Sequence, residues 1–374
     1  MAGWAPYMVM IGLQLVIAIA DIMSKGALER GMSFHVFIVY RLIVSILLLS
    51  PFAYFLDRKT RPSLTRPVFF KLFLLALCGI TGTQHAYFAG LMYSSPTVVG
   101  AMNNLCPAIT FILAILFRQW LLPQLESSAL AGGERWLLLK MECVNIRMHR
   151  GQAKLLGTSI CIGGAMLFTF YKGDKFPPLK VPSTINIHGT SGAKYAKPNW
   201  VKGSCFAIVS TLCWSVFLIL QASIYKVYPA TLSMNAWISF LGVLQSAVVA
   251  VIFERTASPW MIGWDLELLA CLYYGILVSA IGYSLNAWCI SKRGPVFVAL
   301  FFPLQLIIAA ILSAFFLKER LHLGSVIGGC LIILGFYCVM WGKSKDDNNE
   351  KAEDKIPIKD EVEKASNSRE VAAT

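Results

Sequence analysis

Charged residues are scarce in this chain. Asp, Glu, Lys and Arg make up 14% of its 374 residues, whereas hydrophobic residues make up 57% and the mean hydropathy is +0.64. A soluble domain carries about 25% charged residues because it must cover its surface with polar groups. The formal net charge of +13 lies in short loops and in the C-terminal tail. This pattern favours a membrane protein and argues against binding of nucleic acid.

Recognisable motifs for catalysis and metal binding are also missing. The ten cysteines include no CxxC pair, and most lie inside apolar runs, where cysteine acts as a small hydrophobic residue. The sequence has no Gly-rich phosphate loop, no HExxH and no GxSxG. We therefore expect no enzyme, no cofactor, no metal site and no disulfide framework. The N-terminus has no basic region or small-residue cleavage site, so we expect the first apolar run to be retained.

Long apolar runs dominate the sequence instead. Each is close to the roughly 20 residues that cross a bilayer as a helix. The expected fold is an all-α integral membrane protein with ten transmembrane helices. The ten runs are Tyr7–Ala27, Val36–Tyr54, Phe70–Met92, Thr97–Phe117, Leu155–Tyr171, Val201–Ile224, Thr231–Phe253, Leu268–Trp288, Val296–Phe316 and Leu323–Trp341.

One pair of spans recurs in the two halves of the chain. In each half a span with an interior proline, which would kink a helix, precedes a span whose glycines let a neighbouring helix approach closely. Five spans per half is an odd number, so the second half must enter the membrane in the opposite direction. The pattern predicts two inverted five-helix repeats, as in secondary transporters. The repeated residues are Pro107, Gly157 and Gly164, then Pro303, Gly328 and Gly335.

These spans define the expected domains. The first five-helix repeat covers residues 7–171, a linker loop covers 172–200, the second repeat covers 201–341, and 342–374 form a charged tail that we expect to be disordered. Residues 119–140 interrupt the first repeat, either as an interfacial amphipathic piece or as an insertion from the gene model or from splicing. The Lys and Arg residues of the short loops place both termini in the cytoplasm, although the lysines of 172–200 argue the other way.

Three charged residues lie inside the first two spans. A charge at the bilayer centre costs about 3 kcal/mol on insertion scales, so Asp21, Lys25 and Arg41 need a reason to be there. Asp21 and Lys25 are four residues apart and share a helix face. Two interpretations remain open: a structural ion-pair cluster, or a gate at the outer end of the spans.

Intramembrane amides are the main candidates for binding a solute. Gln84 lies in the third span, and Asn103 and Asn104 precede Pro107. A proline kink frees backbone carbonyls, and a nearby amide adds both donors and acceptors. The alternative is hydrogen bonding between helices, worth about 0.6 kcal/mol each. His85, beside Gln84, could carry a proton, but a single histidine in a bundle is more often structural.

The second half offers further polar groups. Trp214 and Gln221 lie on the sixth span, together with Ser210 and Thr211; Tyr283 and Asn286 lie on the eighth span; Gln305 follows Pro303. Trp214, Gln221 and Tyr283 combine apolar surface with hydrogen-bond donors, which suits a small amphiphilic solute.

Several segments together resemble one family. They include GLQLVIAIADIMSKGALERGMS, NNLCPAITFILAILFR, WSVFLILQASIYKVYPATLSMNAW and YYGILVSAIGYSLNAWCISKRGPVFVALFFPL. These resemble the plant nodulin-like, Walls Are Thin-related transporters, also called usually-multiple-acids-move-in-and-out transporters, of the drug/metabolite transporter superfamily with two EamA domains. The similarity covers about residues 7–343, apart from 119–140.

The resemblance implies ten helices in two inverted repeats around a central cavity, and transport of amino acids or auxin-like compounds. It also implies which residues line or shape the cavity. They are Gln14, Asn103, Asn104, Pro107, Trp214, Gln221, Tyr283 and Pro303.

We therefore expect a multi-pass secondary transporter or facilitator that works by alternating access, with Pro107 and Pro303 as hinges. Its expected partners are a small-molecule solute, the lipid bilayer and, as a candidate coupling ion, the proton; its oligomeric state stays open. The plasma membrane is favoured over the vacuolar membrane. The alternatives are a transporter of another solute class, such as a nucleobase or nucleotide-sugar, and a non-transporting scaffold or receptor.

Overall fold

The computed structural model describes residues 4–93, 99, 102–126, 149–171, 200–256, 258–263, 265–316 and 323–353. All regular structure in these residues is helical, as the composition predicts. Six helical runs there are long and apolar enough to cross a membrane: Ala5–Leu28, Phe34–Leu56, Arg66–Gly90, Val201–Tyr225, Thr231–Phe253 and Leu266–Arg293. Three shorter apolar helices are Leu155–Leu167, Pro295–Ala309 and Val326–Val339. An all-helical membrane fold is thus confirmed.

The helices of the described residues fall into two halves along the chain. The first half contains α1 (Ala5–Glu29), α2 (Phe34–Leu56), a continuous run of α3 (Arg66–Ala76), η1 (Leu77–Gly82) and α4 (Thr83–Tyr93), then α6 (Cys106–Glu126) and α8 (His149–Phe170). The second half contains α9 (Trp200–Val227), α10 (Thr231–Phe253), η2 (Ser258–Trp260), the run α11 (Leu266–Tyr273), η3 (Tyr274–Gly282) and α12 (Tyr283–Arg293), then α13 (Pro295–Ala299), α14 (Phe302–Phe316) and α15 (Leu323–Glu353).

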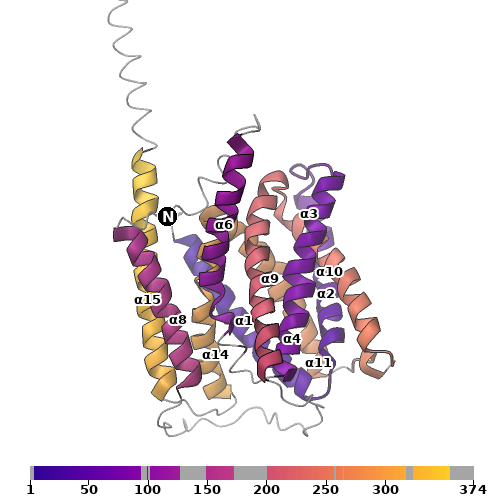
Figure 1. Ribbon diagram of the computed structural model, residues 1–374. Coiled ribbons are helices and arrows are strands. Elements are labelled where there is room, and N and C mark those ends of the chain that lie inside the picture. Colours follow the sequence, from indigo (N-terminus) through magenta and orange to yellow (C-terminus); the bar gives the residue numbers. More distant parts are fainter. Residues whose placement is uncertain are drawn as a thin grey trace, which may run out of the picture.

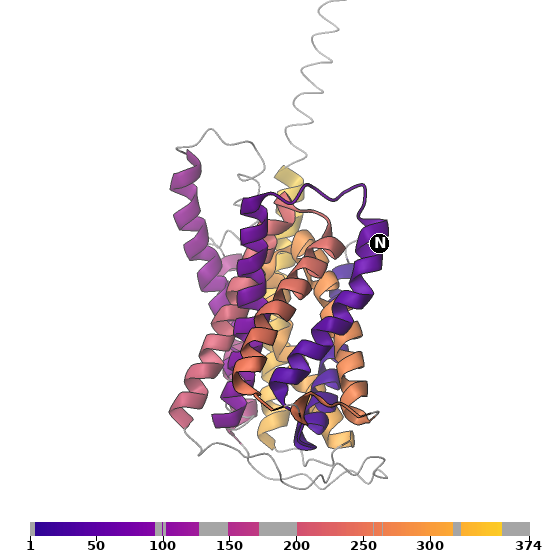
Figure 2. The ribbon, with the colours of Figure 1, turned by 90° about the vertical axis from the view of Figure 1, so that its right-hand side faces the viewer.

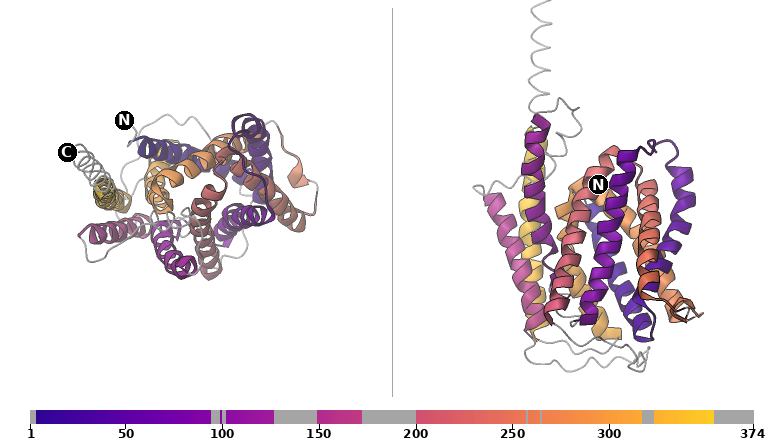
Figure 3. Two further views of the ribbon diagram at one scale, coloured as in Figure 1. Left: turned by 90° about the horizontal axis from the view of Figure 1, so that it is seen from above. Right: turned by 45° about the vertical axis from the view of Figure 1, so that its right-hand side comes forward.

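Helices from the two halves pack against each other rather than forming two separate bundles. α2 packs along α10, α4 along α9, α1 against α14 and α8 along α15. Figures 1 and 2 show these elements as one bundle of upright helices, and in Figure 1 α8 and α15 lie side by side at its left edge. The view from above in Figure 3 separates the α8–α15 pair from the ring of other helices.

Two long runs contain π-helical segments at their centres, η1 and η3, which the sequence did not predict. A π segment inserts extra backbone into a helix and often occurs at functional sites. Both segments also contain a glycine against which a neighbour packs. A Cβ at Gly275 would lie 2.6 Å from the carbonyl oxygen of Arg41, and one at Gly79 would collide with the ring of Phe217. The π segments therefore lie where a neighbouring element packs closely against the helix.

The two prolines interrupt their spans differently from the prediction. We expected Pro107 and Pro303 to kink continuous helices. Instead, each is the second residue of a helix, α6 and α14, and a turn precedes each helix, at Asn104–Leu105 and Leu300–Phe301. Proline is tolerated there because the first-turn N–H groups have no partner within the helix. The predicted kink is therefore a break in the span.

Two helices extend beyond their predicted ends. α6 continues past Phe117 to Glu126, so the first part of the expected 119–140 insertion is helical. α15 continues past Trp341 to Glu353, which differs from the disorder expected from residue 342 onward. An existing helix elongates at little cost once nucleated, and Lys, Glu and Ala favour elongation. Residues 127–140, the linker 172–199 and the tail 354–374 lie outside the described residues.

The glycines of α8 and α15 allow close approach of a neighbouring helix, as the sequence predicts, and the structure shows that the two helices are each other's neighbours. A Cβ at Gly157 would lie 2.7 Å from the carbonyl oxygen of Gly335, and a Cβ at Gly335 would lie 2.6 Å from that of Gly157. A Cβ at Gly164 would likewise lie 2.9 Å from the backbone nitrogen of Ile332. The two backbones are therefore in direct contact, as in other small-residue helix pairs of membranes.

Candidate functional site

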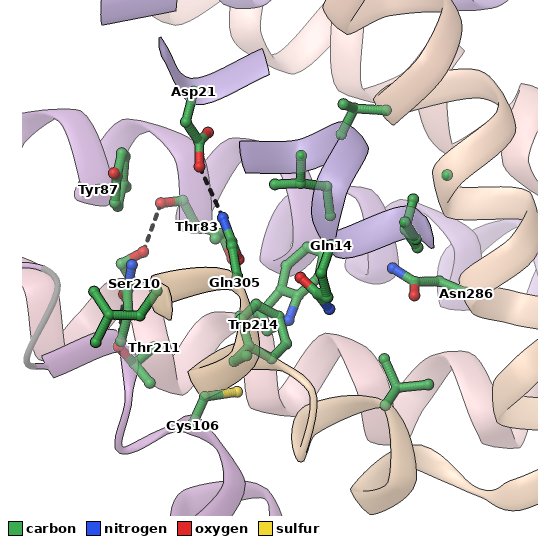
Figure 4. A pocket seen from close by; sticks show the side chains of 18 of the residues that line it. Gln14, Asp21, Thr83, Tyr87, Cys106, Ser210, Thr211, Trp214, Asn286 and Gln305 are labelled. Atoms are coloured by element: carbon green, nitrogen blue, oxygen red, sulfur yellow. Dashed lines mark hydrogen bonds between the residues drawn. The ribbon is translucent and has the colours of Figure 1, made fainter. Parts of the chain in front are cut away.

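A cavity of about 240 Å³ lies between helices of the two halves (Figure 4). α1, α4 and the start of α6 contribute from the first half, and α9, η3, α12, α13 and α14 contribute from the second. Its lining residues are Leu13, Gln14, Ile17, Asp21, Thr83, Gln84, Tyr87, Asn103, Asn104, Cys106, Ser210, Thr211, Trp214, Tyr274, Val278, Gly282, Tyr283, Asn286, Val298, Phe302, Gln305, Leu306 and Ala309.

Most of the residues predicted to bind a solute meet in this cavity. Those that line it are Gln14, Gln84, Asn103, Asn104, Trp214, Tyr283 and Asn286. Gln221 does not: its side chain is fully buried elsewhere, and neither amide atom has a hydrogen-bond partner among the described residues. Pro107 and Pro303 are buried beside the lining residues Cys106 and Phe302 but do not line the cavity themselves.

Two buried amides in the wall have free hydrogen-bonding capacity. Gln14 is 2% exposed and Asn286 is 5% exposed, and the side-chain oxygen of each accepts no hydrogen bond from the described residues. The indole Nε1 of Trp214 likewise donates to no described residue. A buried polar atom without a partner costs about 1–3 kcal/mol. These three groups are therefore available to a polar solute.

Other polar residues of the wall are held in place by hydrogen bonds between helices. The Ser210 hydroxyl donates to the backbone carbonyl of Thr83 at 2.9 Å, which joins α9 to the start of α4 (Figure 4). The Thr211 hydroxyl lies 3.2 Å from the Asn103 side-chain oxygen and donates to the Ala207 carbonyl at 2.9 Å. α9 thus fixes the wall formed by α4 and by the segment before α6.

Aromatic rings form the apolar part of the wall. The Trp214 ring lies 6.0 Å from Tyr283 and 6.0 Å, edge to face, from Phe302. Tyr87 and Tyr274 complete this surface. The sequence analysis did not predict these two tyrosines because it considered amides and charges first. A tyrosine inside a span needs a hydrogen-bond partner for its hydroxyl, and this requirement could have indicated both residues.

The three predicted charged residues do not form one direct cluster. Asp21 lines the cavity and accepts a hydrogen bond from the Gln305 side-chain nitrogen at 2.7 Å. Arg41 is 1% exposed, with its guanidinium carbon 4.2 Å from the centroid of the Tyr274 ring. In the described part of the chain these two side chains form no direct ion pair with each other. The side chain of Lys25 lies outside what the structure describes.

His85 is not the single histidine that the sequence suggested. Its Nδ1 lies 3.1 Å from Nδ1 of His35 on α2, and the two rings stack with centroids 5.1 Å apart. The ring of Phe253 stacks on the other side of His35. Neither histidine lines the cavity. The pair joins α2, α4 and the end of α10, away from the site.

Comparison with known proteins identifies the family. The EamA-like transporter family matches residues 4–125 and again residues 201–341. The chain belongs to the EamA-like transporter family. Its members are membrane transporters, so the chain is a multi-pass membrane protein that works with a small-molecule solute and a lipid bilayer.

Individual EamA-like relatives cover most of the chain. A WAT1-related protein of Arabidopsis thaliana is 41% identical over 345 residues, which are 92% of this chain and 86% of the relative. Protein WALLS ARE THIN 1 of the same organism is 37% identical over 91% of this chain and 83% of its own. The resemblance to Walls Are Thin-related transporters is therefore confirmed.

A solved crystal structure has the same fold. It superimposes on this chain with a TM-score of 0.62 at 15% sequence identity. The superposition covers 90% of this chain and 98% of the chain in that crystal structure. At this identity the similarity bears on the fold alone.

Proposed function

We propose that this chain is a secondary transporter or facilitator that carries amino acids or related small organic compounds, including auxin-like ones, by alternating access. The observation that carries the proposal is the central cavity, whose wall combines unpartnered amides with aromatic rings and draws on both halves of the chain. Such a wall suits a small amphiphilic solute. Membership of the EamA-like family supports the same mechanism.

We further propose ten membrane-spanning helices in two inverted five-helix repeats, covering residues 7–171 and 201–341. Two separate matches to one family support this division. So do features that recur in the same order: a long run with a central π segment, η1 or η3, then a break just before the proline of α6 or α14. Contacts recur as well, since α1 packs on α14 as α9 packs on α6.

Alternating access would use these breaks. Pro107 and Pro303 begin the helices that carry Cys106 and Phe302 into the cavity wall, so a rotation at either break would open or close one side. The hydrogen bond between Asp21 on α1 and Gln305 on α14 would lock the two elements together in one state. In this proposal both termini are cytoplasmic, the plasma membrane is the favoured location, and the proton is a candidate coupling ion.

The cavity argues against the alternative of a nucleotide-sugar transporter. Phosphate groups are bound most effectively by Arg and Lys, and the described lining residues include neither. A neutral or amine-bearing solute fits better. A nucleobase, which is flat and neutral, remains compatible with the aromatic wall.

The test is uptake of radiolabelled solutes into proteoliposomes that contain the full chain. Asn104→Ala and Tyr283→Phe change polar groups of the wall, and each should reduce transport about tenfold, since one hydrogen bond to a charged or polar solute is worth about 1–2 kcal/mol. Gln221→Leu is the matched control because Gln221 is buried outside the cavity. Unchanged transport by correctly folded cavity variants would contradict the proposed site.

A second measurement separates a transporter from a signalling scaffold. A chain that ends at Glu353 lacks the charged residues 354–374. A transporter should keep its basal flux without this segment, whereas a scaffold that signals through it should lose its activity.

A further inference from the structure

The cavity wall is asymmetric in charge. Asp21 is its one carboxylate among the described residues, and Lys, Arg and His are absent from that lining. A carboxylate in a water-poor membrane interior is costly unless it has a positive partner or strong donors. The cavity is therefore better prepared for a positive group on the solute than for a negative one.

The present partner of Asp21 is a neutral one. Its Oδ2 accepts a hydrogen bond of 2.7 Å from the side-chain nitrogen of Gln305, across the cavity from α14 (Figure 4). An amide N–H is a weaker partner for a carboxylate than an ammonium group, because a bond between two charged groups is stronger. Gln305 thus occupies a position that an amine on the solute would fill with a gain in free energy.

Among the described side chains, the buried cation Arg41 does not line the cavity. The guanidinium of Arg41 lies over the Tyr274 ring at 4.2 Å and over the Phe37 ring at 5.5 Å. Tyr274 lines the cavity, whereas Arg41 does not. A solute that enters therefore meets the carboxylate of Asp21 directly, and Tyr274 separates it from the guanidinium.

Other groups of the wall also suit a donor-rich, positively charged solute. Gln14 lies two helical turns before Asp21 on α1, so the two side chains share a face. Gln14 and Asn286 line the cavity, and the side-chain oxygen of each accepts no hydrogen bond from the described residues. The rings of Tyr87, Tyr274 and Trp214 line the same space, and aromatic faces attract ammonium groups.

We propose that Asp21 recognises the protonated amine of the solute, and that the cavity selects amine-bearing cations or zwitterions against the corresponding deaminated acids. This rests on the proposed transport function and narrows it: amino acids and amines are carried, and anionic auxin-like acids are not. On binding, the amine replaces Gln305 at Asp21, which releases the link between α1 and α14.

The experiment compares matched solutes in proteoliposomes with the full chain. The probes are radiolabelled alanine against propionate, and phenylalanine against 3-phenylpropionate and phenethylamine. The wild-type chain should transport alanine or phenylalanine at least tenfold faster than the deaminated acid. Asp21→Asn keeps an oxygen that accepts the Gln305 bond but removes the charge, and it should abolish that preference by lowering transport of the amine tenfold or more.

Asp265→Asn is the matched control. Asp265 is exposed and precedes α11, away from the cavity, so this variant should transport as the wild-type chain does. Thermal stability of the three purified chains shows whether Asp21→Asn is folded. Binding of the same probes to detergent-solubilised chain, read as a shift in melting temperature, provides a measurement that does not depend on transport.

The outcomes separate the two proposals. Transport of deaminated acids as fast as of amines, or equal loss of both in Asp21→Asn, would overturn the role of Asp21 while leaving the transporter intact. Asp21→Asn could instead lose the dependence of transport on a pH gradient and keep the preference for amines. This result would also overturn amine recognition by Asp21 and would indicate that Asp21 carries a proton. Amine-selective binding that needs Asp21, without transport of any probe, would support the role and overturn the proposed function. Absence of both binding and transport of the amines would overturn both.

Discussion

The α8–α15 pair and the helices around the cavity solve opposite packing problems. In the pair, glycines bring two backbones into direct contact and leave no space for side chains. Around the cavity, α1, α4, α9 and α14 line an open space with amides, hydroxyls and rings, several of which have no partner among the described residues. The first region gains stability from close contact, whereas the second gives up stability to keep polar groups free for a solute. Substitutions should therefore affect the two regions in different ways.

The largest effect on stability is expected in the α8–α15 pair. In Gly335→Ala, the new Cβ would lie 2.6 Å from the Gly157 carbonyl oxygen and 2.7 Å from the Cys161 backbone nitrogen. Because both neighbours are backbone, the helices must separate, at a cost of up to about 3 kcal/mol. Thermal unfolding in detergent measures this loss. Gly163→Ala is the control, since nothing lies within 4 Å of that Cβ; equal melting temperatures for the two variants would contradict the direct contact of the backbones.

A cavity amide should separate transport from stability. In Gln14→Leu, a buried oxygen without a partner among the described residues is removed. Stability should stay equal or rise by about 1 kcal/mol, because an unsatisfied buried group is lost, whereas transport should fall about tenfold. Thermal unfolding and uptake into proteoliposomes are measured on the same preparation. A variant that loses stability and transport together would argue for a structural role of Gln14.

The bond between Ser210 and the Thr83 carbonyl should have an intermediate effect. In Ser210→Ala, the hydroxyl that joins α9 to α4 at 2.9 Å is removed, and we expect a loss of about 1 kcal/mol. Ser204→Ala on the same helix is the matched control, because its buried hydroxyl has no partner among the described residues. The prediction fails if both variants unfold at the same temperature.

The smallest effect is expected between α2 and α10. The hydroxyls of Ser45 and Ser239 lie 3.3 Å apart, a distance that indicates a weak bond. Ser45→Ala should cost about 0.6 kcal/mol, the average for hydrogen bonds between membrane helices. A double-mutant cycle with Ser239→Ala isolates the interaction; a coupling energy near 2 kcal/mol would show that this crossing carries more of the stability than its geometry suggests.

Much of the architecture could be predicted because apolar runs and membrane thickness leave few choices. A run such as Phe34–Leu56 must form a helix, since backbone groups in lipid need partners within the segment. The prediction that a neighbouring helix approaches closely at the glycines of these two spans was correct for the same local reason; that the two spans are each other's neighbours was not predicted. Gathering polar residues in one cavity was also foreseeable, because polar groups in spans such as Gln14 and Asn104 tend to face the interior of the bundle.

The features that the sequence did not predict have a common cause, which is tertiary packing. The π segments η1 and η3, the helix breaks before Pro107 and Pro303, and the pairing of His85 with His35 depend on which neighbour packs where. Gln221 has the same chemistry as Gln14 but faces a packed interior. A single sequence gives the polarity of a residue but not the direction in which its helix is rotated.

The sequence by itself determined that this chain is a bundle of membrane helices, that its glycines allow close helix contacts, and that polar groups lie inside the bundle, because lipid penalises most other arrangements of such residues. Only the tertiary structure decided that Asp21 faces a cavity while Arg41 is shielded behind Tyr274. Which side chains meet depends on how helices far apart in the chain are rotated and packed. Small differences in packing free energy decide this, and the composition of a single span does not.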